Sequence, residues 1–358
     1  MSTKTRLRQA WTIAALQLRR VFFSRRSLWV YLLALFPALA FFGHGVEVVV
    51  TRSSLSEHVT HPALMVRMSE GDTPEQVLEL AGEPIDDWTR EGRTLRDGRE
   101  IPERRYMTFF DGRSRWQVRF DDGVLADKSS RLLIDFSDDR QIFAGIFQYF
   151  YLRLAIFFGC LGIFMNLFRG EMLDKTLHFW FLAPARREVL LLGKYMAGLI
   201  ASVVIFTAGA ALCFLVMLWP QEWAELVAFW PNPGLSHLFW YCAAAALACV
   251  GYGSVFLAAG LLLRNPIIPA VVILFWEGVN PLLPGLLQRA SVLYYVQSLA
   301  PVPAPTDPGA PLVFRLLMSP AEPPSTLGAV LGLLFVTGLV LCAAGFAVRR
   351  LEINYSTD

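Results

Sequence analysis

Few residues in this sequence are placed to do chemistry, and Glu277 stands out because it is the only acid well inside an apolar segment. A carboxylate inside such a segment is costly, and by default its presence suggests a function. Asn280, Pro281 and Pro284 follow closely, and we expect the helix to break there. In one interpretation Glu277 and Asn280 line a path and contact a cationic or headgroup part of a substrate. In the other, Glu277 only stabilises the end of a helix.

No other pattern in the sequence supports catalysis. His58 and His61 are three residues apart and could face the same side, but two histidines without an identified third ligand do not predict a metal site. No Ser-His-Asp, His-Glu-x-x-His or paired-carboxylate arrangement stands out, and the phosphate-binding loop Gly-x-x-x-x-Gly-Lys-Ser/Thr is absent. We therefore expect no enzymatic activity, no metal site, and no cofactor or nucleotide bound by this chain.

The elements that must position Glu277 are apolar helices. The chain has 358 residues, of which 55% are hydrophobic and 17% charged, whereas soluble domains average about 45–50% and about 25%. A helix that crosses a bilayer needs about 20 apolar residues. Six segments meet or approach this length, namely 28–50, 144–168, 196–219, 238–263, 266–287 and 327–348. The fifth is interrupted by Glu277, Pro281 and Pro284, so the alternative is five spans with the fifth only dipping into the membrane.

The distribution of basic residues predicts the orientation. Residues 1–27 contain seven Lys or Arg and no acid, and further basic residues follow in 169–195, at Arg264 and at Arg349 and Arg350. The opposite short loops hold Arg289 and Arg315. By the positive-inside rule both termini are cytosolic, and residues 48–146 are outside. That outer stretch has 19 acidic and 14 basic residues. The whole chain has 32 basic and 30 acidic residues, and this near-neutral total rules out a strongly basic nucleic-acid binder.

The sequence thus predicts an α-helical polytopic membrane protein with six transmembrane helices, an N-terminal interfacial helix and a small extracytoplasmic α+β insertion. Residues 7–23 place apolar side chains at helical spacing among arginines, as in a helix lying in the headgroup layer; the alternative is a plain basic anchor before the first span. The predicted parts are a cytosolic amphipathic helix 1–26, a first transmembrane helix 27–50, the insertion 51–143, transmembrane helices two to six within 144–348, and a cytosolic tail 349–358.

Turn and capping signals give the insertion its predicted structure. Thr73 is followed by Pro74 and Gln76, a capping box that should begin a helix, and Gly82 should end it. Two alternating segments, 104–110 and 115–120, are joined by Asp111-Gly112, which favours a hairpin. A further turn at 122–123 leads into a third short strand.

The most informative motif lies in segment 169–195, which we call the elbow, between the second and third apolar segments. It combines charged residues, a Pro-broken turn and a Gly193-Lys194-Tyr195 sequence that begins the next span. The elbow and the six-span pattern resemble the permease subunits of type-2 ABC transporters. The matching positions are Glu171, Thr176, Leu177, Leu182, Pro184, Arg187, Gly193, Lys194 and Tyr195.

The resemblance implies a function and partners. The elbow would form a coupling helix that seats on a separate ABC ATPase subunit, which would bind ATP and Mg²⁺. A second permease copy or a homologous permease would complete the path, and the location would be the bacterial inner membrane. The coupling residues would be Glu171, Asp174, Thr176, Leu182, Pro184, Arg186, Arg187 and Lys194. The family also implies a re-entrant hairpin at 277–300, with Glu277 and Asn280 near the outer mouth of the translocation path.

Residues 64–130 resemble small lipoproteins of the SmpA/OmlA type, which assist outer-membrane assembly. The resemblance rests on Gly71 to Pro84 and on the strands that end near Gly123. It implies helices packed on a small sheet and a possible periplasmic partner for residues 64–130. The leading prediction is a permease subunit of an ATP-driven exporter. The alternative is a membrane-anchored envelope assembly or sensory protein whose outer module is the working part.

Overall fold

The computed structural model describes residues 3–24, 27–94, 100–173, 180, 182, 185–263, 265, 267–303 and 324–350. The chain divides into two compact units. The helical unit comprises Met1–Phe41, Arg140–Met217 and Trp223–Asp358, and the sheet unit comprises Phe42–Asp139 with Leu218–Glu222.

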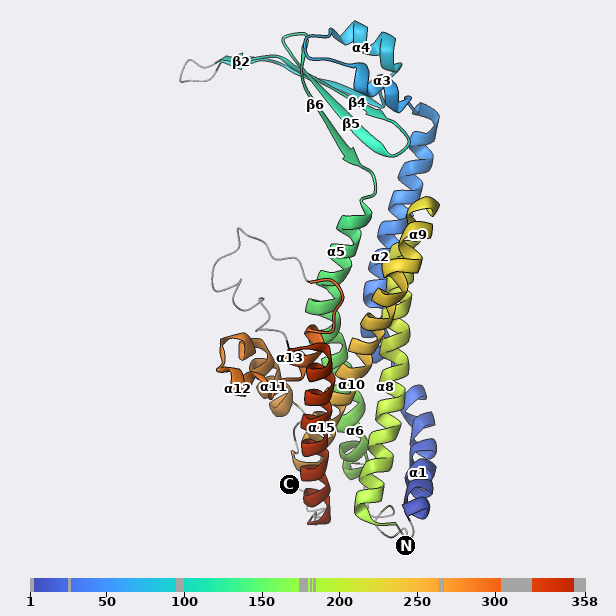
Figure 1. Cartoon of the computed structure of the whole chain (residues 1–358), viewed down its shortest axis with the longest axis vertical. Helices are drawn as coiled ribbons and strands as arrows, with labels where there is room; N and C mark the ends of the chain where they lie inside the picture. Colours follow the sequence, from blue (N-terminus) through green and yellow to red (C-terminus); the bar gives the residue numbers. More distant parts are fainter. Residues whose placement is uncertain are drawn as a thin grey trace. The chain divides into compact units, whose positions relative to one another are not determined.

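Long apolar helices form the helical unit (Figure 1). Within the described residues, five helical runs are long and apolar enough to cross a membrane: Ser27–Leu55, Phe136–Met172, Arg187–Leu218, Trp223–Leu262 and Thr326–Arg349. They contain α2 (Ser27–Leu55), α5 (Phe136–Gly145), the π-helical stretch η2 (Ile146–Ala155), α6 (Ile156–Leu173), α8 (Arg187–Leu218), α9 (Trp223–Phe229), a second π-helical stretch η3 (Trp230–Gly234), α10 (Leu235–Leu262) and α15 (Thr326–Arg349). The chain is therefore a multi-pass, mostly helical protein of the kind found in membranes.

The predicted fifth span is shorter than its sequence suggests. Its helix α11 runs from Ile267 to Val279, and the chain then turns through the 3₁₀ segment η4 (Asn280–Leu282) and the short helices α12 (Gly285–Gln288) and α13 (Val292–Gln297). Thirteen helical residues extend about 20 Å, against a hydrocarbon core of about 30 Å. Helix α11 is therefore shorter than the hydrocarbon core, and six spans, or five with the fifth only dipping into the membrane, both stay predictions.

Helix α10 packs closely against its neighbours because small residues face them. A Cβ added at Gly253 would lie 2.5 Å from Phe164 of α6, and one at Gly251 would lie 2.7 Å from Val292 of α13. Small side chains at such crossings let helices approach closely in lipid. All five cysteines carry free thiols, and Cys160 and Cys249 are buried in this packing, as expected for small packing residues.

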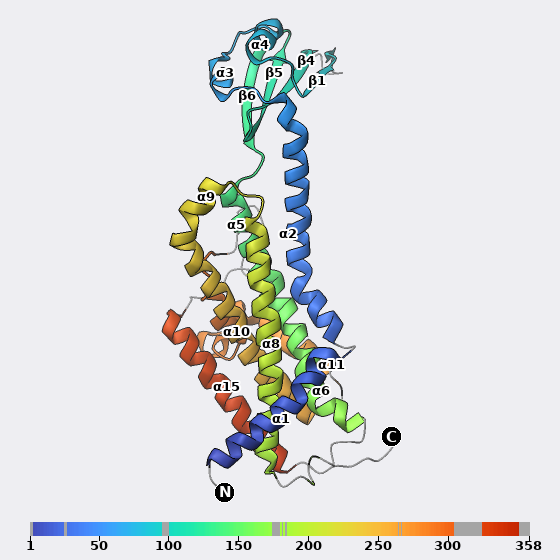
Figure 2. The same cartoon turned by 90° about the vertical axis from the view of Figure 1, so that its right-hand side faces the viewer.

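The N-terminal segment forms the predicted helix, α1 (Thr3–Phe23). Its buried face contains Ala10, Ile13 and Ala14, whereas Leu7 and Trp11 are more than half exposed. Figure 2 shows α1 crossing α8 near the first residues of α8. One side of the helix thus packs against the protein, and the exposed side carries Leu7 and Trp11 among polar and basic residues.

The sheet unit contains two short helices on a four-stranded antiparallel sheet of order β1-β4-β5-β6. The helices are α3 (Pro62–Arg67) and α4 (Pro74–Ala81), and the strands are β1 (Asp86–Arg90), β4 (Arg104–Phe110), β5 (Ser114–Asp121) and β6 (Val124–Leu132). A separate two-stranded ribbon pairs β2 (Arg93–Thr94) with β3 (Glu100–Ile101). The predicted helix, its capping box at Thr73 and the hairpin after Phe110 are confirmed.

The sheet unit also contains elements that the sequence patterns did not predict. Helix α3 lacks a clear apolar period, yet Met65 is fully buried in the core of the unit. Lys128 of β6 donates to the carbonyl oxygens of Met65 and Met68, each at 3.0 Å, and so satisfies the end of α3. Strand β1 was not predicted because all five of its residues are exposed, so it has no alternation of apolar and polar residues.

Candidate functional site

A buried ion pair joins the two ends of the elbow. Glu171 lies near the end of α6 and Lys194 lies in the second turn of α8, and their side chains meet at 2.6 Å. The two residues are 2% and 0% exposed. A pair removed from water in this way stabilises the fold only when hydrogen bonds satisfy its remaining donors and acceptors.

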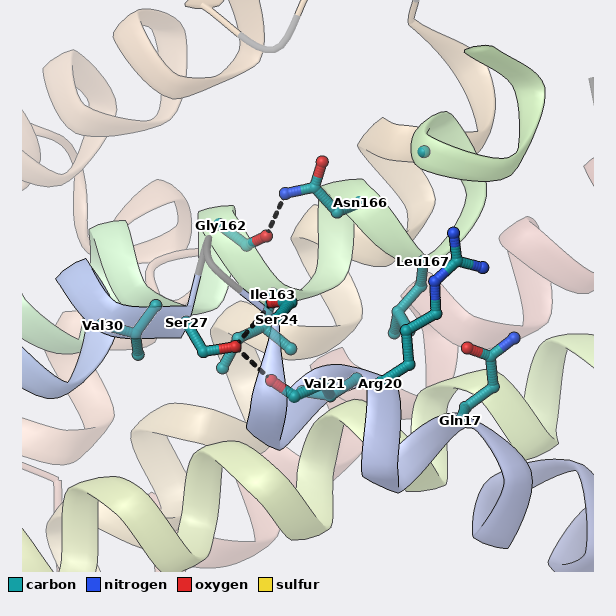
Figure 3. Close-up of a pocket in the computed structure, with 11 residues that line it drawn as sticks. Gln17, Arg20, Val21, Ser24, Ser27, Val30, Gly162, Ile163, Asn166 and Leu167 are labelled. Carbon is teal, nitrogen blue, oxygen red and sulfur yellow. Dashed lines mark hydrogen bonds between the residues drawn. The ribbon is translucent and has the colours of Figure 1, made fainter. Parts of the chain in front are cut away.

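The Glu171–Lys194 pair has further hydrogen-bond and cation–π partners in α1, in α6 and in the elbow. Figure 3 shows Gln17 of α1 beside Leu167 of α6. Gln17 of α1 donates to Glu171 at 2.7 Å, and Lys194 donates to the carbonyl oxygen of Leu167 at 2.5 Å. The Lys194 ammonium also lies 4.9 Å from the ring centre of Phe168 and 5.5 Å from that of Trp180, which adds cation–π attraction. The cluster therefore ties α1, the end of α6 and the start of α8 together.

Helix α1 is fixed to α8 by close packing as well. A Cβ at Gly193 would lie 2.8 Å from the backbone oxygen of Ala10 and 2.8 Å from Cβ of Ile13. Ala10 and Ile13 form a small apolar core with Val189 and Leu190, against which Trp180 packs. The glycine of the Gly-Lys-Tyr sequence is thus required by the approach of α1, and Lys194 beside it supplies the buried charge.

The other predicted coupling residues separate into groups. Leu182 is 79% exposed and Arg186 is also exposed, so both are available to a partner. Arg187 instead donates to the carbonyl oxygen of Arg349 at 3.2 Å and so interacts with the end of α15, where Glu188 also pairs with Arg349. Asp174, Thr176 and Pro184 lie outside the described residues.

Glu277 accepts hydrogen bonds from the first turn of α13. The backbone amides of Val292 and Leu293 donate to its carboxylate at 3.0 and 3.3 Å, and the Ser291 hydroxyl donates to it as well. The side chain is 5% exposed. The geometry is that of an acid that stabilises a helix N-terminus, here reached from a different helix. It matches the interpretation in which Glu277 stabilises the turn.

Two residues near Glu277 were missed by the sequence reasoning. Arg153 of η2 and Tyr252 of α10 both lie close enough to interact electrostatically with its carboxylate. Arg153 is a lone basic residue within the second apolar segment, and that signal was available in the sequence. Asn280 donates to the carbonyl oxygen of Gln288 at 3.1 Å and closes the turn between α11 and α12.

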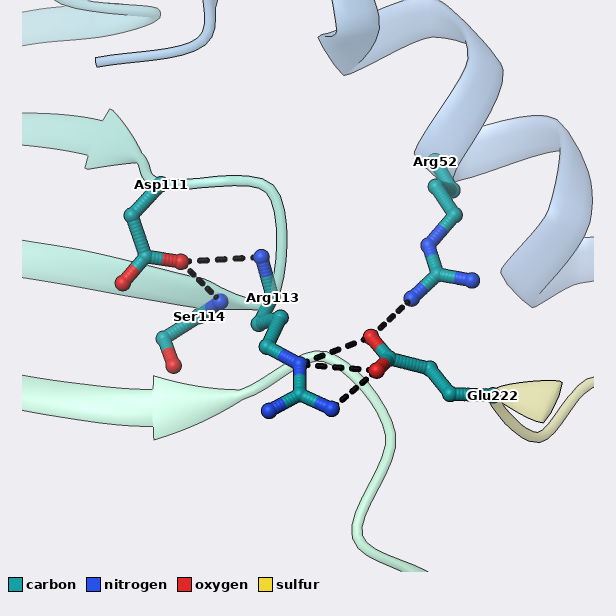
Figure 4. A network of polar contacts seen from close by, with 5 residues as sticks. All are labelled: Arg52, Asp111, Arg113, Ser114 and Glu222. Carbon is teal, nitrogen blue, oxygen red and sulfur yellow. Dashed lines mark hydrogen bonds and ion pairs between the residues drawn. The ribbon is translucent and has the colours of Figure 1, made fainter. Parts of the chain in front are cut away.

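The sheet unit has its own charged cluster around Glu222, which follows α8 in the chain (Figure 4). Arg113, in the β4–β5 turn, donates to the Glu222 carboxylate through Nε at 2.8 Å, and Arg52 of α2 donates at 3.0 Å. The hydrogen bond from Arg113 lowers the pKa of Glu222 below its ordinary value, with both guanidinium charges acting in the same direction against a partial desolvation.

Asp111 holds the same turn in shape. Its carboxylate accepts from the backbone amides of Arg113 at 2.8 Å and Ser114 at 2.6 Å, and from the Trp116 indole at 2.7 Å. Burial by itself would raise the pKa of Asp111, but these three donors outweigh it and the pKa falls below its ordinary value. The turn therefore presents Arg113 to Glu222 in a fixed position.

The histidines and other possible ligands do not gather into a metal site. Within the part of the chain that the structure describes, no group of three or more His, Cys, Asp or Glu side chains could hold a metal ion. The Nδ1 atom of His61 accepts from the Ala63 amide at 3.3 Å and caps α3. No protein-family model, curated protein or solved structure matches this chain.

Proposed function

We propose that this chain is a permease subunit of an ATP-driven exporter that couples to a separate ABC ATPase through its elbow. The observation that carries the proposal is the buried Glu171–Lys194 pair with its Gln17 bond. It gives the elbow a rigid base, so a push on the elbow moves α6, α8 and α1 together and does not bend the loop alone.

The exposed part of the elbow is the proposed docking surface. Leu182 offers an apolar side chain and Arg186 offers a charge, and both are exposed. ATP and Mg²⁺ would bind on the ATPase, since the sequence has no phosphate-binding loop. Two permease chains, either copies of this one or homologues, would form the path across the bacterial inner membrane. Glu277 and Asn280 are proposed to shape the outer end of that path by holding the hairpin, with both termini in the cytosol.

The test is reconstitution of the purified full chain with the ATPase encoded nearest to it. We expect the two chains to co-purify, and Leu182→Glu to abolish stimulation of ATP hydrolysis while the permease stays folded. Val66→Glu is the matched control, because Val66 is a similarly exposed apolar residue in the sheet unit. Failure of the ATPase to co-purify, or equal effects of the two substitutions, would refute the coupling role.

A second candidate function rests on the face of the sheet opposite α3 and α4. Strand β1 is exposed along its length, and Trp88 stacks on Tyr106 of β4 with ring centres 4.2 Å apart. An exposed edge strand beside an aromatic pair suits binding of an extended polypeptide. The sheet unit would then dock a periplasmic partner, as the lipoprotein resemblance of residues 64–130 implies. Capture of a partner by the chain but not by Trp88→Ala would favour this function over a spacer role.

A further inference from the structure

The four-stranded sheet has one covered face and one open face. Met107, Phe109, Val118 and Phe120 are buried in a core with residues of α3 and α4. Because successive side chains of a strand point to opposite sides, the residues between them point to the other side, which we call the open face. The exposed and half-buried residues that share the open face are Asp86, Trp88, Arg90, Arg104, Tyr106, Thr108, Arg115, Gln117, Arg119, Asp121, Asp127, Ser129 and Arg131.

The open face is basic, although the sheet unit as a whole is acidic. The face carries five arginines and three aspartates, a net charge of +2, whereas residues 48–146 contain 19 acidic and 14 basic residues. One of these aspartates is shared, because Asp121 lies 3.5 Å from Nε of Arg104 and 3.5 Å from Nε of Arg119. Neither Nε donates a hydrogen bond to it. The charges of the open face therefore complement an anionic partner.

Two pairs of arginines face each other across neighbouring strands. Arg90 of β1 lies opposite Arg104 of β4, and at the other end of the sheet Arg115 of β5 lies opposite Arg131. Like charges directly opposite each other destabilise a sheet, and a bound anion between them would remove that cost. Asp121, which lies opposite Arg104, is six residues from Arg115 along β5, so the two pairs are separated by about 20 Å.

The surface between the two arginine pairs suits a polypeptide better than a membrane. Thr108, Gln117 and Ser129 lie in one row across three strands, and their hydroxyl and amide groups can hydrogen-bond to a peptide backbone. Trp88, stacked on Tyr106, is the large apolar side chain that the open face exposes. Binding in a membrane surface uses several such side chains, because its strength increases with the apolar area buried.

We propose that the open face binds an extended acidic segment of a partner protein. Its acidic side chains would lie between the arginines of each pair, and an apolar side chain between them would pack against Trp88 and Tyr106. An extended chain covers about 20 Å in about six residues, so the two acidic groups would be about six residues apart. The proposal rests on the second candidate function, in which the sheet unit docks a partner, and it names the chemistry of that partner.

The test is fluorescence anisotropy of a labelled peptide of alternating Glu and Thr, long enough to span about 20 Å, titrated with the full chain purified in detergent. We expect this peptide to bind more tightly than its Gln–Thr counterpart, and added salt to weaken the binding. Arg115→Gln should weaken it about tenfold, the effect of one lost charge-assisted contact. Arg115→Lys keeps the charge and should retain the preference for the acidic peptide.

Two comparisons separate binding from folding and from general charge. Arg115→Gln should leave the thermal unfolding midpoint unchanged or raise it, because it removes the repulsion with Arg131. Arg67→Gln is the matched control, since Arg67 is an exposed arginine at the end of α3, which packs on the covered face. It should leave peptide binding unchanged.

The remaining outcomes overturn the proposal. Equal binding of the two peptides would refute acidic recognition, and equal loss for Arg67→Gln and Arg115→Gln would mean that the peptide binds the general charge of the unit. Displacement of the peptide by phosphatidylglycerol vesicles, but not by phosphatidylcholine vesicles, would assign the open face to a membrane surface. Failure of the acidic preference leaves the docking function to be judged by partner capture and its loss in Trp88→Ala. Failure of that capture leaves the peptide preference measurable by itself.

Discussion

At the scale of single residues, Lys194 and Glu171 differ in the contacts that each buried charge would keep if its ion-pair partner were removed. Lys194 would keep the Leu167 carbonyl and two aromatic rings if Glu171 lost its charge. Glu171 would keep the Gln17 amide if Lys194 were removed. A buried carboxylate costs more to leave uncompensated than an ammonium that retains a carbonyl and two π faces.

This asymmetry gives the first prediction. Lys194→Met should destabilise the chain by about 3–5 kcal/mol, as expected when one partner of a buried pair is lost. Glu171→Gln should cost less, and the double variant should recover part of the loss because no charge is left buried. The thermal unfolding midpoint of the detergent-purified chain is the measurement. A double variant less stable than Lys194→Met would show that the pair is not the dominant interaction.

Gly193 gives a second prediction at this scale. Gly193→Val should push α1 away from α8, because the added Cβ would meet the Ala10 oxygen and the Ile13 Cβ, and neither can move unless α1 itself shifts. Trypsin should then cleave faster after Arg8 than in the native chain. Gly345→Ala is the control, since a Cβ there meets nothing within 4 Å and should stabilise α15 by about 0.5–1 kcal/mol. Unchanged cleavage in Gly193→Val would contradict the close packing of α1.

At the scale of elements, the sequence predicted most where local chemistry decides the structure. The capping box at Thr73 and the turn after Phe110 depend on neighbouring residues, and both are confirmed. The role of Glu277 could not be settled in this way, because its partners at Ser291 to Leu293 come from a different helix. Strand β1 is stabilised by pairing with β4 and not by burial, so its sequence shows no alternation of apolar and polar residues that would predict a strand.

The hairpin gives a prediction that separates the two interpretations of Glu277. Glu277→Ala should loosen the start of α13 and remove the negative charge near Arg153, so we expect a loss of about 2 kcal/mol or more. Glu277→Gln keeps an acceptor and should cost less. Hydrogen exchange of the Val292 and Leu293 amides measures the effect directly. If Glu277→Gln leaves these amides protected but lowers transport in the reconstituted complex, Glu277 lines the path as well as holding the turn.

At the scale of the whole molecule, the near-neutral net charge of +2 conceals an uneven distribution. The basic residues of the N-terminal segment and the elbow fall within the helical unit, while most acidic residues fall within the sheet unit. The sheet unit also includes Leu218–Glu222, a loop far along the chain from its other residues. No pattern in the sequence predicted a structural role for this loop. Glu222 and Arg113 are far apart in the chain, and only the fold brings Glu222 to the β4–β5 turn.

The ion pairs that Glu222 of this loop forms with Arg113 and Arg52 therefore depend on pH. Its pKa in the folded chain lies below the ordinary value of 4.5 because Arg113 and Arg52 stabilise the carboxylate. The unfolded segment thus takes up a proton first as pH falls, so the stabilisation is fully present above pH 4.5 and is lost as pH falls below that value. Both arginines are substantially exposed, so we expect a contribution of only about 0.5–1 kcal/mol.

The prediction compares hydrogen exchange in the Asp111–Ser114 turn between the native chain and Glu222→Gln, after correction for the intrinsic effect of pH on exchange. At pH 7 the native turn should be the better protected of the two, because only the carboxylate forms ion pairs with Arg113 and Arg52. Below pH 4 the difference should shrink, since the native Glu222 is then increasingly protonated and resembles the glutamine. Glu70→Gln, at an exposed acid of the same unit, should follow the native profile throughout. A difference that persists unchanged at low pH would mean that Glu222 holds the turn through its shape and not through its charge.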